Sequence, residues 1–282
     1  MNIARLNSFG NFTCSQWIKN GIVVGNEEGL AGRSSLILTE IENKLKQRYT
    51  SEELKNKTII DIGCYDGFYL THLSKLGFKK ITGLEPKEKN ILKGKEIRKF
   101  LKITEPNINW IHGDLSKLND EKYDIVLCLG VLHHVTDHFS FLKNLTKFTS
   151  QILFIDCRVT PDNIVKKRLF FEKTEMLDVI YKFKKPKISI SSHKYESSFN
   201  DTSTDKTGIV SIPNKNSIGL FLESVNFKTN VLVAPDEYRK RLNHKRNLDG
   251  LLIYSEPTKS KKKFSLTYAI NYERKIFKTL FP

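Results

Sequence analysis

The stretch from Thr58 to Gly77 reads TIIDIGCYDGFYLTHLSKLG and decides the fold. A nearly continuous apolar run, Thr58–Ile62, predicts a buried strand, and the apolar spacing of Phe68–Leu76 predicts a helix that ends at Gly77. The turn between them carries Gly63 and Gly67, which let the chain bend sharply and let helix and strand approach each other. Strand, glycine turn and helix in this order are typical of a nucleotide-binding unit, in which free N–H groups at the helix start face the ligand.

The residues of this turn restrict the kind of ligand. Tyr65 stands where a G-x-G-x-x-G loop has its second glycine, the position that gives a diphosphate close access to the backbone. No Lys-Ser or Lys-Thr pair follows Gly67, so the turn does not match a P-loop. The turn therefore favours an adenosine ligand that depends less on phosphate contacts than NAD does.

Three further motifs follow in chain order: Gly83-Leu-Glu85-Pro86, Gly113-Asp114-Leu115, and Tyr123-Asp-Ile-Val-Leu-Cys-Leu-Gly130-Val-Leu-His133-His134-Val. Together with Asp61-Ile-Gly63-Cys64-Tyr65-Asp66-Gly67, they resemble the class I S-adenosylmethionine (SAM)-dependent methyltransferases over roughly residues 55 to 160, with weaker similarity to about residue 257. The resemblance implies an α/β fold, a Rossmann-like three-layer sandwich. Its seven-stranded sheet would be mostly parallel, with the last strand antiparallel. It also implies SAM as the donor of a methyl group to an N, O or C atom.

Glu85 is the acid that we expect to bind the ribose of the donor. It stands at the carboxyl end of the predicted strand Lys80–Leu84, about twenty residues after the glycine turn, and Pro86 fixes the turn that follows. A carboxylate at this position can accept hydrogen bonds from both ribose hydroxyls. The alternative is a solvated strand end.

The resemblance assigns the remaining donor contacts. In the family, an acid after the third strand, here predicted as Ile108–His112, accepts from the adenine amino group, and its neighbour packs on the ring. Asp114 and Leu115 occupy these positions, although Asp114 has capping of the turn as its alternative role. The residues expected at the donor are Asp61, Gly63, Cys64, Tyr65, Asp66, Gly67, Glu85, Pro86, Asp114, Leu115, Leu129 and Gly130.

Two adjacent histidines, His133 and His134, follow the fourth predicted strand, Tyr123–Leu127. Ligands of open α/β sheets bind outside the carboxyl ends of the strands, so these side chains are expected between donor and acceptor. A histidine titrates near neutral pH and can take a proton from an incoming hydroxyl or amine. Either histidine is a candidate catalytic residue, and the alternative is that both only shape the pocket.

Arg158 is the candidate for binding the acceptor. It lies near the end of the fifth predicted strand, Gln151–Val159, and its guanidinium can clamp a carboxylate or phosphate through paired hydrogen bonds. It can equally pair with Asp156 or another acid, and the sequence leaves both roles open.

A chain of 282 residues can bury one large α/β core with appendages. We expect an N-terminal cap and helix over residues 1–50, a methyltransferase domain over residues 51–257 with an insertion at about 160–210, and a basic tail over residues 258–282. Within these, the pattern predicts helices at Ser34–Tyr49, Ile164–Phe183 and Pro213–Val225, a short strand at Ile188–Ser191, and a closing antiparallel pair at Phe227–Val233 and Gly250–Tyr254. The polar stretch Ser197–Thr207 is predicted as a lid over the acceptor, with a disordered linker as the alternative.

The net charge of +16 is the main compositional signal. Residues 238–282 carry twelve Lys and Arg against three Asp and Glu, which favours a local basic surface for RNA, an anionic membrane or a partner; a general lysine bias is the alternative. The four cysteines form no C-x-x-C pair, which predicts a reducing, cytoplasmic setting without a metal site. No apolar run approaches the ~20 residues that span a bilayer.

We therefore predict a cytoplasmic SAM-dependent methyltransferase that acts on an O or N atom of a small-molecule or carbohydrate acceptor, without a metal. A first alternative is RNA modification, because GCYDG and GVLHH also resemble the tRNA wobble-uridine carboxymethyltransferase family. That family carries Tyr at the position of His133 and has a long basic N-terminal extension that is lacking here. A second alternative is a catalytically silent module that keeps the fold for binding alone.

Overall fold

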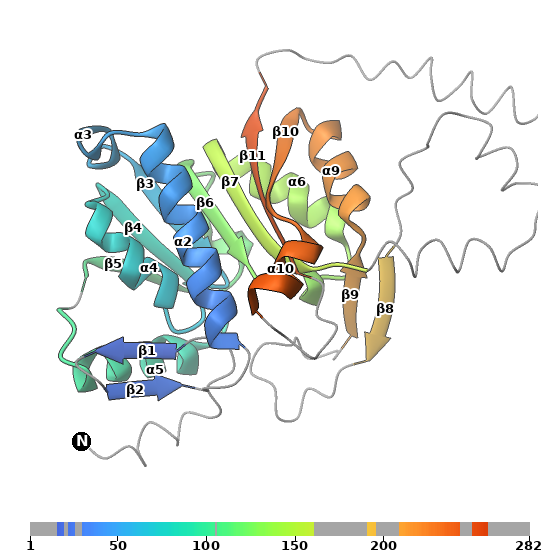
Figure 1. Ribbon diagram of the computed structural model, residues 1–282. Coiled ribbons are helices and arrows are strands. Elements are labelled where there is room, and N and C mark those ends of the chain that lie inside the picture. The colour runs from blue at the N-terminus through green and yellow to red at the C-terminus, as the bar shows by residue number, and fades with distance from the viewer. Residues whose placement is uncertain are drawn as a thin grey trace, which may run out of the picture.

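The computed structural model describes residues 16–19, 22–25, 30–104, 106–160, 191–195, 209–242 and 250–258. Its centre is a seven-stranded sheet in the order β10-β11-β7-β6-β3-β4-β5 (Figure 1). The strands are β3 (Thr58–Ile62), β4 (Lys80–Glu85), β5 (Ile108–His112), β6 (Tyr123–Leu129), β7 (Thr149–Arg158), β10 (Phe227–Val233) and β11 (Gly250–Pro257). Within this sheet β11 runs antiparallel to both of its neighbours, and the other paired strands are parallel. The predicted fold class is confirmed.

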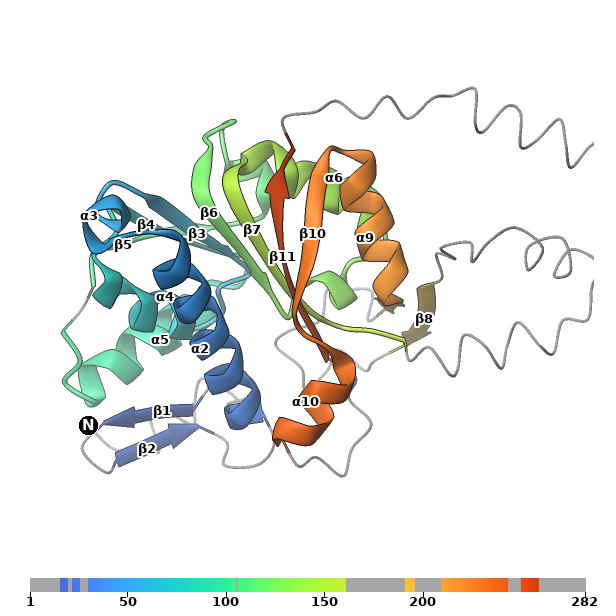
Figure 2. The same ribbon diagram turned by 45° about the horizontal axis from the view of Figure 1, so that its top comes forward.

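Helices cover both faces of the sheet and give it three layers (Figure 2). The alternation of side chains along β3 sends Ile59 into one core with α2 (Leu30–Arg48) and α4 (Phe68–Leu73). It sends Ile60 into a second core with α6 (His138–Phe148) and α9 (Lys215–Ser224). Strands buried on both sides read as continuous apolar runs, which is why TIIDI and YDIVLCL do so.

The fourth strand of the prediction is longer in the structure than its pattern indicated. β6 continues through Cys128 and Leu129, two residues beyond the predicted end at Leu127. Both side chains are buried, and Leu129 is in register with Asp156 of β7. Their positions are therefore set by strand pairing.

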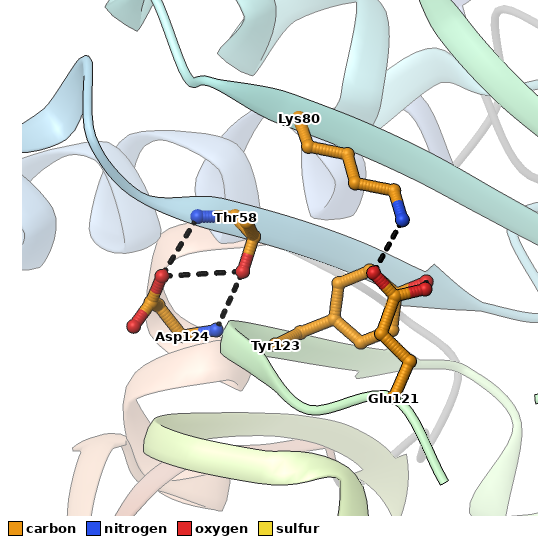
Figure 3. Close-up of polar contacts among 5 residues, drawn as sticks. All are labelled: Thr58, Lys80, Glu121, Tyr123 and Asp124. Carbon is orange, nitrogen blue, oxygen red and sulfur yellow. Dashed lines mark hydrogen bonds and ion pairs between the residues drawn. The ribbon is translucent and has the colours of Figure 1, made fainter. Parts of the chain in front are cut away.

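Polar contacts fix the amino ends of the central strands (Figure 3). Asp124 accepts hydrogen bonds from the backbone N–H and the hydroxyl of Thr58, at 2.9 and 3.1 Å. Beside this pair, Glu121 forms an ion pair with Lys80 and accepts a hydrogen bond from the Tyr123 hydroxyl at 3.0 Å. These contacts join β3, β4 and β6 at the edge of the sheet that lies opposite the glycine turn.

The N-terminal segment is more regular than the looped cap that we expected. It contains a hairpin of β1 (Gln16–Lys19) and β2 (Ile22–Gly25), and α2 begins at Leu30 instead of Ser34. A short helix α3 (Ser51–Leu54) follows, and helix α5 (Glu88–Phe100) connects β4 to β5.

The C-terminal part adds α10 (Pro235–Leu242) and a separate antiparallel pair of β8 (Ser191–Tyr195) and β9 (Ile209–Pro213). α10 lies beside α2, where Arg241 bonds to Glu40 at 2.8 Å (Figures 1 and 2). The predicted helix Ile164–Phe183, the lid Ser197–Thr207 and the basic tail lie outside the described residues. Of the strand predicted at Ile188–Ser191, only Ser191 is described, and it begins β8.

Two compositional predictions can be compared with the structure in part. Cys64, Cys128 and Cys157 are buried free thiols, while Cys14 lies outside the described residues. None of the helices in the described ranges combines the length and apolar character needed to cross a membrane.

Candidate functional site

The glycine turn, residues 63–67, follows β3 and lies at the carboxyl edge of the sheet. Gly63, Tyr65 and Gly67 have φ angles of 70°, 53° and 75°, all in the left-handed region. A Cβ on Gly63 would lie 2.6 Å from the Val131 side chain, and one on Gly67 would lie 2.3 Å from the Trp110 ring. Both positions therefore require glycine for space as well as for conformation.

Tyr65 is the non-glycine residue at the centre of this turn. Its backbone N–H donates to Glu85 Oε2 at 2.9 Å, and its hydroxyl accepts from Lys93 Nζ at 3.2 Å. The ammonium also lies 5.2 Å from the centre of the Tyr65 ring, a cation–π distance. These contacts hold a tyrosine where a dinucleotide-binding loop has glycine.

Glu85 ends β4 directly beside the turn, and its side chain is 4% exposed. Besides the Tyr65 N–H, its carboxylate accepts from Lys87 N at 3.0 Å and Asn90 Nδ2 at 2.9 Å. A carboxylate can accept about four hydrogen bonds, so three of these positions are filled and about one is left. Burial raises the pKa of Glu85, and the three donors oppose that shift.

Asp61 is the second buried acid at this edge and is 1% exposed. Among the described residues, neither of its carboxylate oxygens has a hydrogen-bond partner. Burial, followed by the nearby charges of Glu85 and Asp66, raises its pKa well above the ordinary value. A buried acid without a donor is costly in a folded protein, so Asp61 is a position where a cationic ligand would be stabilised.

Asp66 and Cys64 complete the turn, and both are buried. Asp66 accepts from the indole N–H of Trp17 at 3.1 Å and from Phe68 N at 3.2 Å, so its carboxylate holds the start of α4. Burial raises the pKa of the Cys64 thiol well above its usual value, which keeps it protonated and unreactive. Both residues shape the turn, and their contact with a donor stays a prediction.

Asp114 follows β5 at the same edge but is exposed. Its Oδ1 accepts from Ser116 N at 2.9 Å and Ser116 Oγ at 2.6 Å, and these bonds lower its pKa. It therefore caps the short 3-10 helix η2 (Leu115–Lys117), the alternative role considered above. Gly113 N donates to Glu85 O at 3.0 Å, which keeps this turn beside β4, and Pro86 O bonds with the ring of His112.

The segment after β6 carries Gly130 and the two histidines. Gly130 has φ 79°, its N–H donates to Asp156 O at 2.8 Å, and a Cβ placed there would meet no atom of the described part of the chain within 4 Å. His133 and His134 lie on the 3-10 helix η3 (Leu132–His134), with ring centres 4.1 Å apart, and His133 is 5% exposed. β9, which follows the predicted insertion, packs against this helix.

Asp156 at the end of β7 bonds to two residues that sequence reasoning did not select. Arg33 Nη2 of α2 lies 2.6 Å from one carboxylate oxygen, and the Tyr238 hydroxyl of α10 lies 2.6 Å from the other. No motif surrounds Arg33 or Tyr238, and they stand 123 and 82 residues from Asp156. The acceptor-clamping role of Arg158 stays a prediction.

Comparison with known proteins agrees with this arrangement. Residues 60–151 match the family model described as "Methyltransferase domain". Residues 60–151 form a methyltransferase domain. The resemblance to class I SAM-dependent methyltransferases is thereby confirmed for the part of the chain that carries the glycine turn, Glu85, Asp114 and His133.

The methyltransferase domain also relates the chain to proteins of different named activities. A tRNA U34 carboxymethyltransferase of Campylobacter hominis is 37% identical over 95 residues, which are 33% of this chain and 32% of the relative. A ubiquinone biosynthesis O-methyltransferase of Rickettsia bellii is 32% identical over 151 residues, 52% of this chain and 58% of the relative. The chain thus spans about a third and somewhat over half of these two relatives.

Solved structures share the fold over a larger part of the chain. The N-terminal domain of EvdMO1, crystallised with SAH and D-fucose, has a TM-score of 0.60 at 15% identity and covers 90% of this chain and 95% of its own. Magnesium protoporphyrin IX methyltransferase from Synechocystis PCC 6803, with bound SAH, has a TM-score of 0.52 at 14% identity, covering 80% and 84%. At these identities the likeness concerns the fold alone.

Proposed function

We propose that the protein is a SAM-dependent methyltransferase that methylates an O or N atom of a small-molecule or carbohydrate acceptor. The observation that carries the proposal is Asp61, a buried acid with no hydrogen-bond donor among the described residues, beside Glu85 and the glycine turn. The methyltransferase domain match covers all three features. Proteins rarely bury an unpaired acid without a functional reason.

The residues present fit the chemical groups of SAM, which supplies a methyl group bonded to a positively charged sulfur. Asp61 would hold the ammonium of the donor, because it is an acid without a partner in the described part of the chain. Glu85 would accept one ribose hydroxyl in its remaining position, and a second hydroxyl would replace one of its present donors. Asp114 would accept from the adenine amino group while Oδ1 keeps its bonds to Ser116.

The acceptor side is proposed at Gly130 and the histidine turn. Gly130 follows β6 at the carboxyl edge, three residues before His133, and a Cβ there would meet no atom of the described residues within 4 Å. A hydroxyl acceptor needs a base, and His133 or His134 would take its proton. An amine acceptor needs only to arrive unprotonated. Alignment of the acceptor within about 3–3.5 Å of the methyl group supplies much of the rate. Among the described residues no group of His, Cys, Asp and Glu is arranged to hold a metal ion.

A donor-binding titration tests the proposal. We expect wild type to bind SAM, and Glu85→Ala to bind it at least about 100-fold more weakly, because a charged hydrogen-bond acceptor contributes about 1.5–3 kcal/mol and three donors of the site lose their partner. Glu121→Ala, an acid at the opposite edge, is the matched control and should bind normally. Absence of binding by wild type would refute the proposal.

The acceptor class is tested with radiolabelled SAM and fractionated cell extract. Label in small molecules or carbohydrates supports the proposal. Binding of SAM without transfer to any fraction would instead favour a silent binding module.

The free thiols of Cys64, Cys128 and Cys157 support a reducing compartment such as the cytoplasm.

RNA modification is the second candidate, and the relatives named tRNA U34 carboxymethyltransferase favour it. The net charge of +16 is consistent with attraction to a polyanion. Retention of tRNA that falls steeply with salt, together with label entering RNA in the extract experiment, would replace the small-molecule acceptor by RNA.

A further inference from the structure

Both tryptophans of the chain, Trp17 and Trp110, lie against the glycine turn although they come from different parts of the fold. Trp110 of β5 packs on Gly67 and Gly83. Trp17 of β1 is completely buried, and its indole N–H donates to Asp66 Oδ2 at 3.1 Å. The hairpin of β1 and β2 therefore reaches the turn, although it lies outside the seven-stranded sheet (Figure 1).

Asp66 is held by three separate elements. Its carboxylate bonds to Trp17 of β1 and to Phe68 N at the start of α4. Its carbonyl accepts from Arg98 Nη1 of α5 at 2.9 Å, and a Cβ on Gly94 of the same helix would come within 1.9 Å of that oxygen. The turn is thus packed tightly against α5, and Trp17 adds a contact from β1.

Arg98 connects the two tryptophans. It is completely buried, and its guanidinium carbon lies 5.9 Å from the centre of the Trp17 ring and 5.0 Å from that of Trp110. Trp17 also packs edge-to-face on Phe68, with ring centres 5.4 Å apart. Shape and charge therefore fix the indole orientation that directs its N–H at Asp66.

The contact between Trp17 and Asp66 leads directly to the proposed donor site. Asp66 stands between Tyr65 and Gly67, both in the left-handed region, which is costly for tyrosine and persists only where surrounding contacts impose it. The N–H of Tyr65 is the donor that holds Glu85 Oε2. Movement of Asp66 would therefore displace the bond that orients Glu85.

We propose that Trp17 is a positioning residue of the donor site, whose indole N–H fixes Asp66 so that the turn keeps Tyr65 on Glu85. The N-terminal hairpin thereby contributes to donor binding through Trp17. The predicted change in donor affinity rests on the proposed function. The predicted change in the mobility of the turn does not depend on a ligand.

The first test is the affinity for SAH, measured by calorimetry. Trp17→Phe keeps an aromatic ring and removes the N–H, and we expect it to bind SAH about tenfold more weakly, as loss of a hydrogen bond to a charged group predicts. Tyr49→Phe is the control, because it keeps the aromatic ring and removes polar contacts away from the turn: the Tyr49 hydroxyl donates to Gln151 and accepts from Arg48 Nε, both at 2.9 Å. It should bind SAH as wild type does.

The second test is amide hydrogen exchange without ligand. We expect exchange at Tyr65 to be at least tenfold faster in Trp17→Phe and unchanged in Tyr49→Phe. Asp66→Ala removes the acceptor of the same bond, and the double variant should cost less than the two single effects combined. The single variant at Asp66 also tests the bond if Trp17→Phe does not fold.

The outcomes separate the two proposals. If wild type binds no SAH, the proposed function is wrong, and exchange at Tyr65 alone decides the role of Trp17. If wild type binds SAH and Trp17→Phe binds it equally well, or if exchange at Tyr65 does not change, Trp17 is not a positioning residue.

Discussion

Asp124 and Asp61 are acids on neighbouring central strands, β6 and β3, but at opposite edges of the sheet. Asp124 at the amino edge accepts from Thr58 N, Thr58 Oγ1, Gln151 Nε2 and Ser150 Oγ. Asp61, near the carboxyl edge, is more deeply buried and accepts from none of the described residues. The acid at the amino edge stabilises the fold, whereas the acid at the carboxyl edge costs stability, because its hydrogen-bonding capacity is not used by the described residues.

The largest difference in unfolding free energy is expected between alanine substitutions at two glycines, one at each edge. Gly67 at the carboxyl edge and Gly77 before β4 at the amino edge have φ of 75° and 80°. Among the described residues, a Cβ at Gly77 would meet only the flexible Lys55 side chain, at 3.6 Å, so the cost of alanine there is that of the left-handed conformation, about 1–2 kcal/mol. Alanine at Gly67 adds a clash with Trp110 at 2.3 Å, which raises the expected cost to about 3–4 kcal/mol.

Urea unfolding of Gly67→Ala and Gly77→Ala measures both costs. Equal losses of unfolding free energy would show that Trp110 moves aside easily and that the turn is not tightly packed.

Substitution of Asp124 should have the next largest effect. Asp124→Asn replaces one carboxylate oxygen by an amide N–H₂ group. If it replaces Oδ2, the bonds from Thr58 are lost, and if it replaces Oδ1, those from Ser150 and Gln151 are lost. We expect a loss of about 2–3 kcal/mol in unfolding free energy, because hydrogen bonds to charged groups contribute about 1.5–3 kcal/mol. SAM affinity of the folded variant should stay at the wild-type value. Weaker binding would mean that the amino edge also sets the geometry of the donor site.

These two edges also differ in how far the sequence predicts them. The strand, glycine turn and helix at Thr58–Leu76 are predictable because their signals are local, and Glu85 follows from its place at a strand end. Trp17, Arg33 and Tyr238 are not predictable, since each contacts its partner across 49 to 123 residues without a motif. The exposure of Asp114 also needed the structure, because a capping acid and a ligand-binding acid have the same sequence signal.

The same Asp-to-Asn change at Asp61 should act in the opposite direction. The pKa of Asp61 is raised in the fold by burial, Glu85 and Asp66, so protonated Asp61 adds to the unfolding free energy. This contribution is complete below the ordinary pKa of 3.8. That contribution is lost as the pH rises towards the folded pKa. Asparagine does not titrate, so Asp61→Asn does not lose stability as the pH rises. The variant should therefore become more stable than wild type as the pH rises through that window, by at most about 1.4 kcal/mol per pH unit.

Unfolding free energy measured at several pH values from 3 upwards tests this sign. SAM affinity should fall in Asp61→Asn, because the amide has no charge for the ammonium. In wild type, SAM affinity should rise with pH over the same window, since the acid must lose its proton to pair with the donor. A variant less stable than wild type at neutral pH would indicate that Asp61 is not an unpaired acid.

The smallest effect is expected at the ion pair of Lys80 and Glu121 beside Asp124 (Figure 3). Their side chains are 36% and 47% exposed, so water and salt screen the pair, and such pairs contribute about 0–1 kcal/mol. Lys80→Met should lower unfolding free energy by less than about 1 kcal/mol, and the difference from wild type should shrink in 1 M salt. SAM affinity should not change. A larger, salt-independent loss would show that the contact of the Lys80 ammonium with the Tyr123 ring, 5.5 Å from the ring centre, stabilises this edge in addition to the ion pair.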